Sequence, residues 1–292
     1  MKALAIVSKD LKLNFQSARA FYSKIQVRKH SDPELNTAFE QLLFGLNQIA
    51  SLRAMTSVPN KADVARMGIV AWYYAVYGSA SAMIAVADGS FQETHAATAN
   101  QWDQIFAAKG LAMPPFGDRL TNLLNETIKE ELIPIRSRGK HSLTAVPRDT
   151  TQGWGCLAEY LSGCASWEQW NLQQRVRNQA DFKKLGVADF RTKDARAIRD
   201  VAYQRVSLSF LHQAFRYRGK ANYRDAIFLA YGNGVPALVA GLIDDLAEVA
   251  TAFSVMSAGY VSARIGKDLW GVFVEDLEKK RSVSISPKTI WS

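Results

Sequence analysis

The segment at 205–232, RVSLSFLHQAFRYRGKANYRDAIFLAYG, gathers side chains that can do chemistry on a phosphodiester. If this segment is helical, Arg205, His212 and Arg216 fall near one face, because seven residues make almost two turns and four more make about one. Arginines at such a site hold a phosphate, and a histidine moves protons near neutral pH. The spacing therefore makes Arg205 and His212 the candidate catalytic residues.

The same segment also carries the candidate nucleic-acid-binding residues, which combine positive charge with aromatic rings. They are Arg216, Arg218, Lys220, Tyr223 and Arg224. A tyrosine ring can stack on an unpaired base. Only one acid lies beside these cations, so some of them must face water or an anionic ligand. An amphipathic helix with its arginines in water shows the same mixture, and that alternative stays open.

Other motifs of known chemistry are missing from the sequence. It contains no GxxxxGK[ST], no GxGxxG after a strand, no HExxH and no GxSxG. Cys156 and Cys164 form no CxxC pair, and no histidine lies close to either of them in sequence. We therefore expect no metal site and no cofactor, and two buried thiols in preference to a local disulfide.

The composition indicates a globular protein with a basic surface. Its 36 Lys and Arg against 27 Asp and Glu give a net charge of +9, which favours polyanionic partners such as nucleic acid, although many intracellular proteins are simply basic. The N-terminal apolar run is too short for a signal peptide, so we expect a cytoplasmic protein. Residues 67–87 carry no charge, but Tyr73, Tyr74 and Tyr77 favour a buried helix over a membrane span.

Capping residues, apolar spacing and helix breakers predict an all-α fold, a helical bundle. Five helices are expected from their starts: at Ser31-Asp32-Pro33, at Asn60 to Asp63 with an end at Asp88-Gly89, at a Ser90–Glu93 capping box with an end near Gly110, at Ser166–Gln169, and at Pro236. Four more are expected over about 118–132, before Pro134, over about 194–217, the longest, over about 221–231, and over about 267–280. The tail at 282–292 is expected to be an extended arm.

Residues 134–155 are rich in Gly and Pro and are expected to form a long loop. We predict one all-α domain over 1–292 with this insertion, and the alternative is two all-α halves at 1–133 and 156–292. Trp154, Trp167 and Trp170 are expected to pack in the core, with a partner surface as the alternative.

Residues 71–95, AWYYAVYGSASAMIAVADGSFQETH, resemble a stretch of the HEPN family of all-α proteins. Members show an uncharged helix that begins with a Tyr-Tyr-Ala type sequence, then small residues, then a Thr-His pair, which here are 73–75, Ala80 and Ala82, and 94–95. In the resemblance His95 belongs to the fold. HEPN proteins also carry an Arg-x4–6-His motif, and Arg205 with His212 meets that spacing.

Further segments resemble a second HEPN pattern, Arg-(Asn or Gly)-Lys-Ala-Asp-Tyr, at 218–223 and at 177–182. Two departures stand out. Val206 replaces the polar residue that usually follows the motif arginine, and the two matching regions lie far enough apart to require an insertion. Arg136 and His141 meet the same loose Arg–His spacing inside the 134–155 loop.

The resemblance implies a four- or five-helix bundle that pairs into a dimer. Active HEPN members are metal-independent endoribonucleases, and such proteins often serve in toxin–antitoxin or phage-defence systems. Many others have lost catalysis and act as binding or assembly modules. We therefore expect an RNA-directed protein, as a homodimer or as a subunit of a complex, with no membrane partner. The rivals are a non-catalytic helical subunit that binds another protein and a basic DNA-binding protein.

Overall fold

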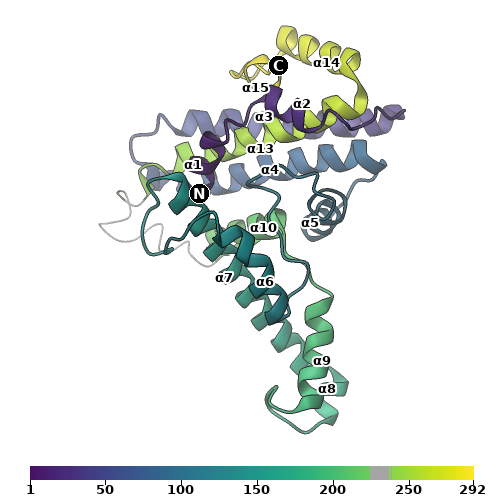
Figure 1. Cartoon of the computed structure of the whole chain (residues 1–292). Helices are drawn as coiled ribbons and strands as arrows, with labels where there is room; N and C mark the ends of the chain where they lie inside the picture. The colour runs from purple at the N-terminus through teal and green to yellow at the C-terminus, as the bar shows by residue number, and fades with distance from the viewer. Residues whose placement is uncertain (224–236, 238) are drawn as a thin grey trace.

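The computed structural model describes residues 1–223, 237 and 239–292, and of 220–223 it describes the backbone alone. Over these residues the chain is all-α, as the sequence predicts (Figure 1). The helices, labelled as in Figure 1, are α1 (Lys2–Asp10), α2 (Phe15–Phe21), α3 (Asp32–Met55), α4 (Ala65–Asp88), α5 (His95–Trp102), α6 (Asn125–Arg136), α7 (Thr150–Arg177), α8 (Ala180–Lys184), α9 (Lys193–Gln204), α10 (Phe210–Tyr223), α13 (Leu242–Ile265), α14 (Lys267–Lys280) and α15 (Lys288–Trp291), with a 3-10 turn η1 (Lys61–Asp63) and a π-helical turn η2 (Asp103–Ala107).

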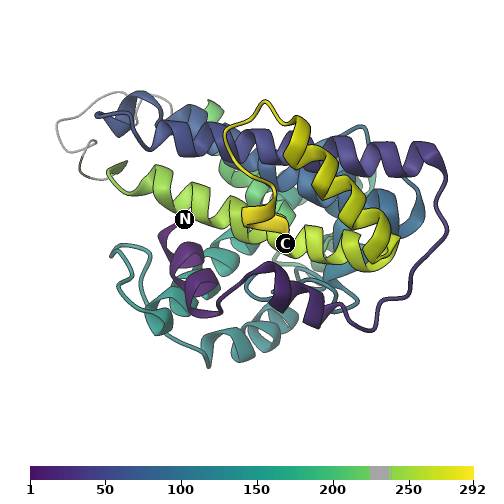
Figure 2. The ribbon, with the colours of Figure 1, turned by 90° about the horizontal axis from the view of Figure 1, so that it is seen from above.

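The main bundle is built around α3, α4 and α13, each of which packs against the other two (Figures 1 and 2). Glycines bring α3 and α4 close together. A methyl group at Gly78 would lie 2.8 Å from the Gln41 carbonyl oxygen, and one at Gly45 would lie 3.1 Å from the Ser79 hydroxyl. Such close approach of two helix backbones needs residues without a side chain. The uncharged helix expected at 67–87 is therefore a core helix.

Two described helices, α4 and α13, have the length and apolar composition of a membrane span. In each, 83% of the most apolar window is buried inside the protein. Burial by neighbouring helices accounts for this apolar character, so both helices are compatible with a soluble protein.

The predicted helix start at Ser31 is confirmed, whereas the helix expected from Asn60 begins later, at Ala65. Ser31 and Glu34 form a capping box at α3, with Pro33 in the first turn. Asn60 caps η1, which leads into α4, and Gly89 ends α4 with a φ of 80°.

The capping box expected at Ser90 and Glu93 is wrong. Thr94 caps α5 instead, because its hydroxyl accepts a hydrogen bond from the Ala97 amide at 3.2 Å. The Ser90 amide donates to the Asp88 carboxylate, which holds Ser90 in the turn before the helix.

Residues 120–208 form an arm that extends from the bundle (Figure 1). Its two ends meet in an antiparallel bridge, in which the amides of Leu120 and Leu208 donate to each other's carbonyl at 2.8 and 2.9 Å. The arm has a hydrophobic core of its own, contributed by α6, α7 and α9. The main core contains residues of α1 to α5 and of α10, α13, α14 and α15. The chain therefore leaves the bundle and returns to it at one place.

The helix expected at 118–132 is wrong in both bounds. Its first residues instead run alongside the returning chain at Leu208, and α6 begins at Asn125. The helix continues through Pro134 to Arg136, because Ile135 is buried in the arm core. Pro134 therefore lies inside the last turn and does not end the helix.

The predicted 134–155 loop is also too long, because α7 begins at Thr150 and contains Gly153 and Gly155. These glycines allow close packing and make no turn. A methyl group at Gly153 would lie 2.9 Å from the Val7 side chain on α1, and one at Gly155 would lie 2.2 Å from the His141 amide nitrogen.

The helix start expected at Ser166–Gln169 is wrong as well, since both residues lie inside the 28-residue α7. The Ser166 hydroxyl bonds back to the Ser162 carbonyl of the preceding turn, as mid-helix serines often do.

The single helix expected at 194–217 is wrong, because α9 ends at Gln204 and α10 begins at Phe210. Two contacts hold the break between them. Leu208 pairs with Leu120, and the Ser207 hydroxyl donates to the Asp103 carboxylate at 2.7 Å. Arg205 and His212 therefore do not lie on one helix, and helical spacing does not place them on one face.

The C-terminal tail is not an extended arm. It packs against α13 and ends in α15, where Trp291 is fully buried (Figure 2). The Trp291 indole donates to the Ser254 hydroxyl at 3.0 Å. The helix predicted at 267–280 matches α14. The helix expected at 221–231, apart from its first three residues, and the helix start at Pro236 lie outside the described residues.

Candidate nucleic-acid interface

The structure separates the two predicted catalytic residues. Arg205 follows the last residue of α9 and is exposed, with no ion pair or hydrogen bond of its side chain to the rest of the described chain. His212 lies in the first turn of α10 and is half-buried. Lys220 and Tyr223 belong to α10 by their backbone, but their side chains, and the whole of Arg224, lie outside the described residues.

His212 is held at both ring nitrogens. Nδ1 accepts from the Ser209 amide at 3.2 Å, so it carries no proton, and Nε2–H donates to the Asn100 side-chain oxygen at 2.9 Å. Burial lowers the pKa of His212, and the nearby charge of Asp103 opposes that effect in part. His212 is therefore neutral at pH 7, and it accepts another proton only by giving up the bond to Ser209.

Asp103, which is 2% exposed, is bound by Arg119 and by Ser207 of the segment before α10. Arg119 donates to both of its carboxylate oxygens at 2.9 Å, and Ser207 donates to one of them. Burial by itself would raise the pKa of Asp103, but the hydrogen bonds from Arg119 and Ser207 outweigh it and the pKa is lowered. The carboxylate thus joins η2 to both ends of the arm.

An open pocket of about 750 Å³ lies between α5, α7, α10 and the segment before α10, and we refer to it as the α5–α7–α10 cleft. This volume lies within the usual range of small-molecule sites. Its lining consists of Ala96, Asn100, Cys164, Trp167, Glu168, Arg175, Val206, Ser207, Leu208, His212, Phe215, Arg216, Arg218 and Gly219. The cleft therefore brings together His212, Arg216 and Arg218 from the predicted set and excludes Arg205.

Positive charge dominates the lining of the cleft. Three arginines face one carboxylate, Glu168, which pairs with Arg175 at 2.5 Å. The Arg216 guanidinium lies 4.5 Å from the centre of the Trp167 ring and donates to a main-chain carbonyl. Among the described residues, Arg216 and Arg218 have no carboxylate partner. These two cations are therefore available to an anion in the cleft.

Arg218 reaches from the cleft into an aromatic cluster. Its guanidinium lies 4.8 Å from the Tyr73 ring centre and 5.3 Å from that of Phe215. His95 packs against Tyr73 and Phe215, with ring centres 5.3 and 5.9 Å away. Burial, and then the charge of Arg218, lower the pKa of His95. The buried Arg218 Nε has no acceptor among the described residues.

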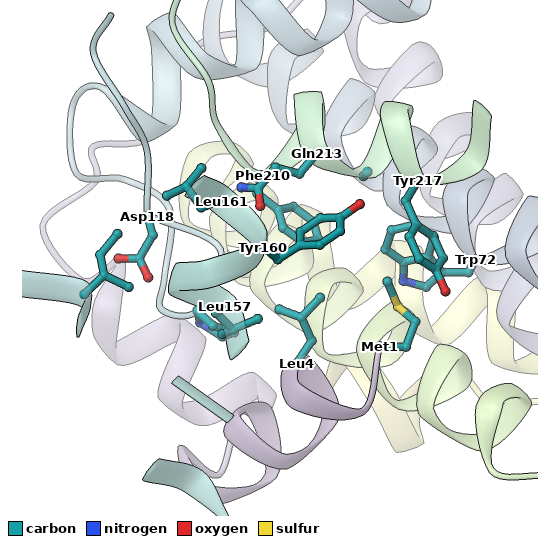
Figure 3. A pocket seen from close by; sticks show the side chains of 13 residues that line it. Met1, Leu4, Trp72, Asp118, Leu157, Tyr160, Leu161, Phe210, Gln213 and Tyr217 are labelled. Atoms are coloured by element: carbon teal, nitrogen blue, oxygen red, sulfur yellow. The ribbon is translucent and has the colours of Figure 1, made fainter. Parts of the chain in front are cut away.

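Two other hollows are poorer candidates. The cavity in Figure 3, about 40 Å³, lies between Leu4, Trp72, Tyr160 and Tyr217 and holds a few waters at most. A second open pocket of about 750 Å³ lies beside the loop after α6. It contains the alternative Arg–His pair of the sequence, but Glu159 already neutralises Arg136 there, at 2.9 Å.

Sequence reasoning missed two residues of the cleft, Asn100 and Arg175, and the buried Asp103 close to it. They carry no recognisable signal, because only the packing of distant segments brings them near His212 and Arg216. Of the three tryptophans expected in the core, Trp154 is buried, Trp167 lines the cleft and Trp170 is 54% exposed.

Both cysteines are buried and neither forms a disulfide, as predicted. Within the described part of the chain, no three metal-binding side chains of His, Cys, Asp or Glu come together. Comparison of the chain with protein-family models, with curated proteins and with solved structures found no match to any of them.

Proposed function

We propose that this protein binds single-stranded RNA in the α5–α7–α10 cleft, as an RNA-directed protein of HEPN-like type. One observation carries the proposal: Arg216, stacked on Trp167, and Arg218 line the same open cleft with no carboxylate partner among the described residues. A charge of +9 on the whole chain favours the approach of a polyanion.

The chemistry of the lining matches an unpaired strand. Guanidinium groups bind phosphate oxygens through paired N–H donors, and they keep their charge at any physiological pH. Trp167 and Phe215 supply flat apolar surface against which a base can stack. A duplex would present its phosphates without its base faces, so the aromatic lining favours a single strand.

The catalytic form of the proposal is a metal-independent endoribonuclease of the toxin–antitoxin or phage-defence kind. His212 would take the proton of the ribose 2′-hydroxyl as this oxygen attacks the adjacent phosphorus, which forms a 2′,3′-cyclic phosphate. The bond from phosphorus to the 5′-oxygen would break, and this oxygen would leave as a hydroxyl with a proton from water. Arg216 and Arg218 would stabilise the charge of the transition state, since Arg205 lies outside the cleft. His212 would have to exchange its bond from Ser209 for one from the substrate.

A second candidate function is a non-catalytic helical subunit that binds RNA or assembles with another protein. The engagement of both His212 ring nitrogens favours this candidate, because neither nitrogen is free to take a proton. A homodimer or a complex with a co-expressed neighbour would fit either candidate.

The test of RNA binding compares two variants of equal charge. Arg216→Gln with Arg218→Gln removes the cleft cations, and Lys24→Gln with Arg53→Gln removes two exposed cations of the bundle. By fluorescence anisotropy with a labelled RNA 12-mer, we expect the cleft variant to bind at least about tenfold more weakly, because charge-assisted hydrogen bonds contribute about 1.5–3 kcal/mol each. Equal affinity of the two variants would refute the proposal.

The test of catalysis is RNA cleavage in EDTA by the wild type and by His212→Ala. Cleavage by the wild type alone supports the endoribonuclease. If the wild type binds RNA and leaves it intact, the non-catalytic candidate stands. Cleavage by both proteins at equal rates would remove His212 from the mechanism.

A further inference from the structure

The far end of the arm concentrates the positive charge of the protein. We call residues 175–205 the arm tip, which comprises the end of α7, α8, α9 and their connections (Figure 1). The arm tip contains nine Lys or Arg, four Asp and no Glu. About a tenth of the chain thus carries more than half of its net charge of +9.

Carboxylates neutralise only part of this charge. Each acid–base pair of the arm tip is local, and the pairs are Arg175–Glu168, Lys184–Asp181, Arg191–Asp189 and Arg199–Asp200. Within the described chain, Lys183, Lys193, Arg196 and Arg205 have no carboxylate within ion-pair distance, and all four are exposed. Unpaired surface cations at this density attract a polyanion.

The arm tip is a folded surface. Val176, Phe182 and Ala195 form a small core of their own beneath it. The guanidinium groups of Arg177 and Arg199 lie over the Phe190 ring, 5.5 and 5.9 Å from its centre. These contacts join the end of α7 to the middle of α9, and the two helices pack against each other. The backbone that carries the cations is therefore folded.

Helix α7 connects the arm tip to the α5–α7–α10 cleft. Trp167 and Arg175 line the cleft, Trp170 is 54% exposed, and Arg177 belongs to the arm tip. From Trp167 to Arg177 the helix rises about 15 Å, a length spanned by four or five stacked nucleotides at about 3.4 Å each. A strand that begins in the cleft therefore reaches the arm tip after a few nucleotides.

We propose that the arm tip is a second nucleic-acid-binding surface, which holds the sugar–phosphate backbone of the strand whose bases enter the cleft. The order of the two surfaces along one strand rests on the function proposed for the cleft, whereas binding of a polyanion at the arm tip does not. Contacts there are to phosphate, so they add affinity without sequence preference. They also make binding dependent on strand length.

The experiment compares a labelled oligouridine of four nucleotides with one of twenty. The tip variant is Lys183→Gln, Lys193→Gln and Arg196→Gln, and its charge-matched control is Lys24→Gln, Lys29→Gln and Arg53→Gln. All six side chains are exposed, and circular dichroism checks that both variants fold. Arg196→Lys, which keeps the charge, should bind as the wild type does.

We expect the tip variant to bind the 4-mer like the wild type and the 20-mer on the order of tenfold more weakly at 0.15 M salt. The slope of log K against log salt should fall by about 2, since each phosphate contact on a single strand contributes about 0.7. Equal slopes for the tip variant and its control would overturn the inference.

The same titrations separate this inference from the proposed function. If Arg216→Gln with Arg218→Gln leaves both oligonucleotides bound as before while the tip variant weakens the 20-mer, the function proposed for the cleft fails and the arm tip remains a polyanion site. If the cleft variant weakens both oligonucleotides and the tip variant matches its control, the arm-tip proposal fails by itself. Preference of the arm tip for an acidic protein over the 20-mer would also overturn it.

Discussion

Replacing Asp103 by Asn tests whether one buried carboxylate holds the base of the arm. The side chains of Asp103 and Arg119 are 3% and 19% exposed and are joined by two hydrogen bonds of 2.9 Å. Removal of one partner from such a buried pair costs about 3–5 kcal/mol, because the remaining charge stays uncompensated. Asn keeps the shape and one acceptor, so we expect a loss near the lower end, about 3 kcal/mol.

Urea unfolding at pH 7 measures this loss, and the melting temperature should fall by about 6 °C at the sensitivity usual for large domains. The double variant Asp103→Leu with Arg119→Met should be closer to the wild type than Asp103→Asn is, since an apolar pair leaves no buried charge. Hydrogen exchange should also become faster at the Leu120 and Leu208 amides, which pair across the arm base.

The pH dependence gives an independent check. Because the folded pKa of Asp103 is lowered, its contribution to stability is present above the unfolded pKa of about 4 and is lost as pH falls through the folded pKa. The difference between wild type and Asp103→Asn should therefore be largest near pH 7 and smaller below pH 4. A difference under about 1 kcal/mol at pH 7, or one that grows on acidification, would refute the reasoning.

The remaining predictions concern packing and protonation. Gly155→Ala should destabilise the protein by about 1–3 kcal/mol, because its methyl group would meet the backbone at His141. Gly163→Ala lies in the same helix with open space around it and should stabilise the protein by about 0.5–1 kcal/mol. Urea unfolding that ranks the two variants in reverse would contradict this. Trp291→Ala should lower the free energy of unfolding by about 3–5 kcal/mol, because it leaves a cavity in the core and removes the hydrogen-bond donor to Ser254. An unchanged melting temperature would contradict the packing of the tail against α13. His212 should titrate by NMR below its ordinary pKa of 6.5, so that its contribution to stability is full above that pH and falls below it, and a higher midpoint would contradict its burial.

Much of the fold follows from the sequence, because its signals act over a few residues. The capping box at Ser31, the cap at Asn60 and Gly89 at a helix end each concern backbone groups within about one turn, so they appear wherever the residues do. The uncharged run at 67–87 predicts a buried helix from composition alone. The all-α class and the bounds of α14 come from signals of the same local kind.

The candidate site needed the tertiary structure. His212, Arg216 and Arg218 lie close in sequence and were found as a basic segment, but what surrounds them comes from elsewhere in the chain. Asn100 lies 112 residues from His212, and the Trp167 ring contacts Arg216 because α7 and α10 line the same cleft. No spacing rule predicts such contacts, since they depend on how whole helices pack.

The errors at the arm have the same physical cause. Gly155 in the sequence suggests a turn, and only the chain that approaches it at His141 shows that the missing side chain serves packing inside a helix. The helical pattern at 194–217 is continuous in sequence, yet the pairing of Leu208 with Leu120 and the bond from Ser207 to Asp103 break it. Local helix propensity contributes tenths of a kcal/mol per residue, so a few tertiary contacts outweigh it. These tertiary contacts determine which arginines share a cleft with His212.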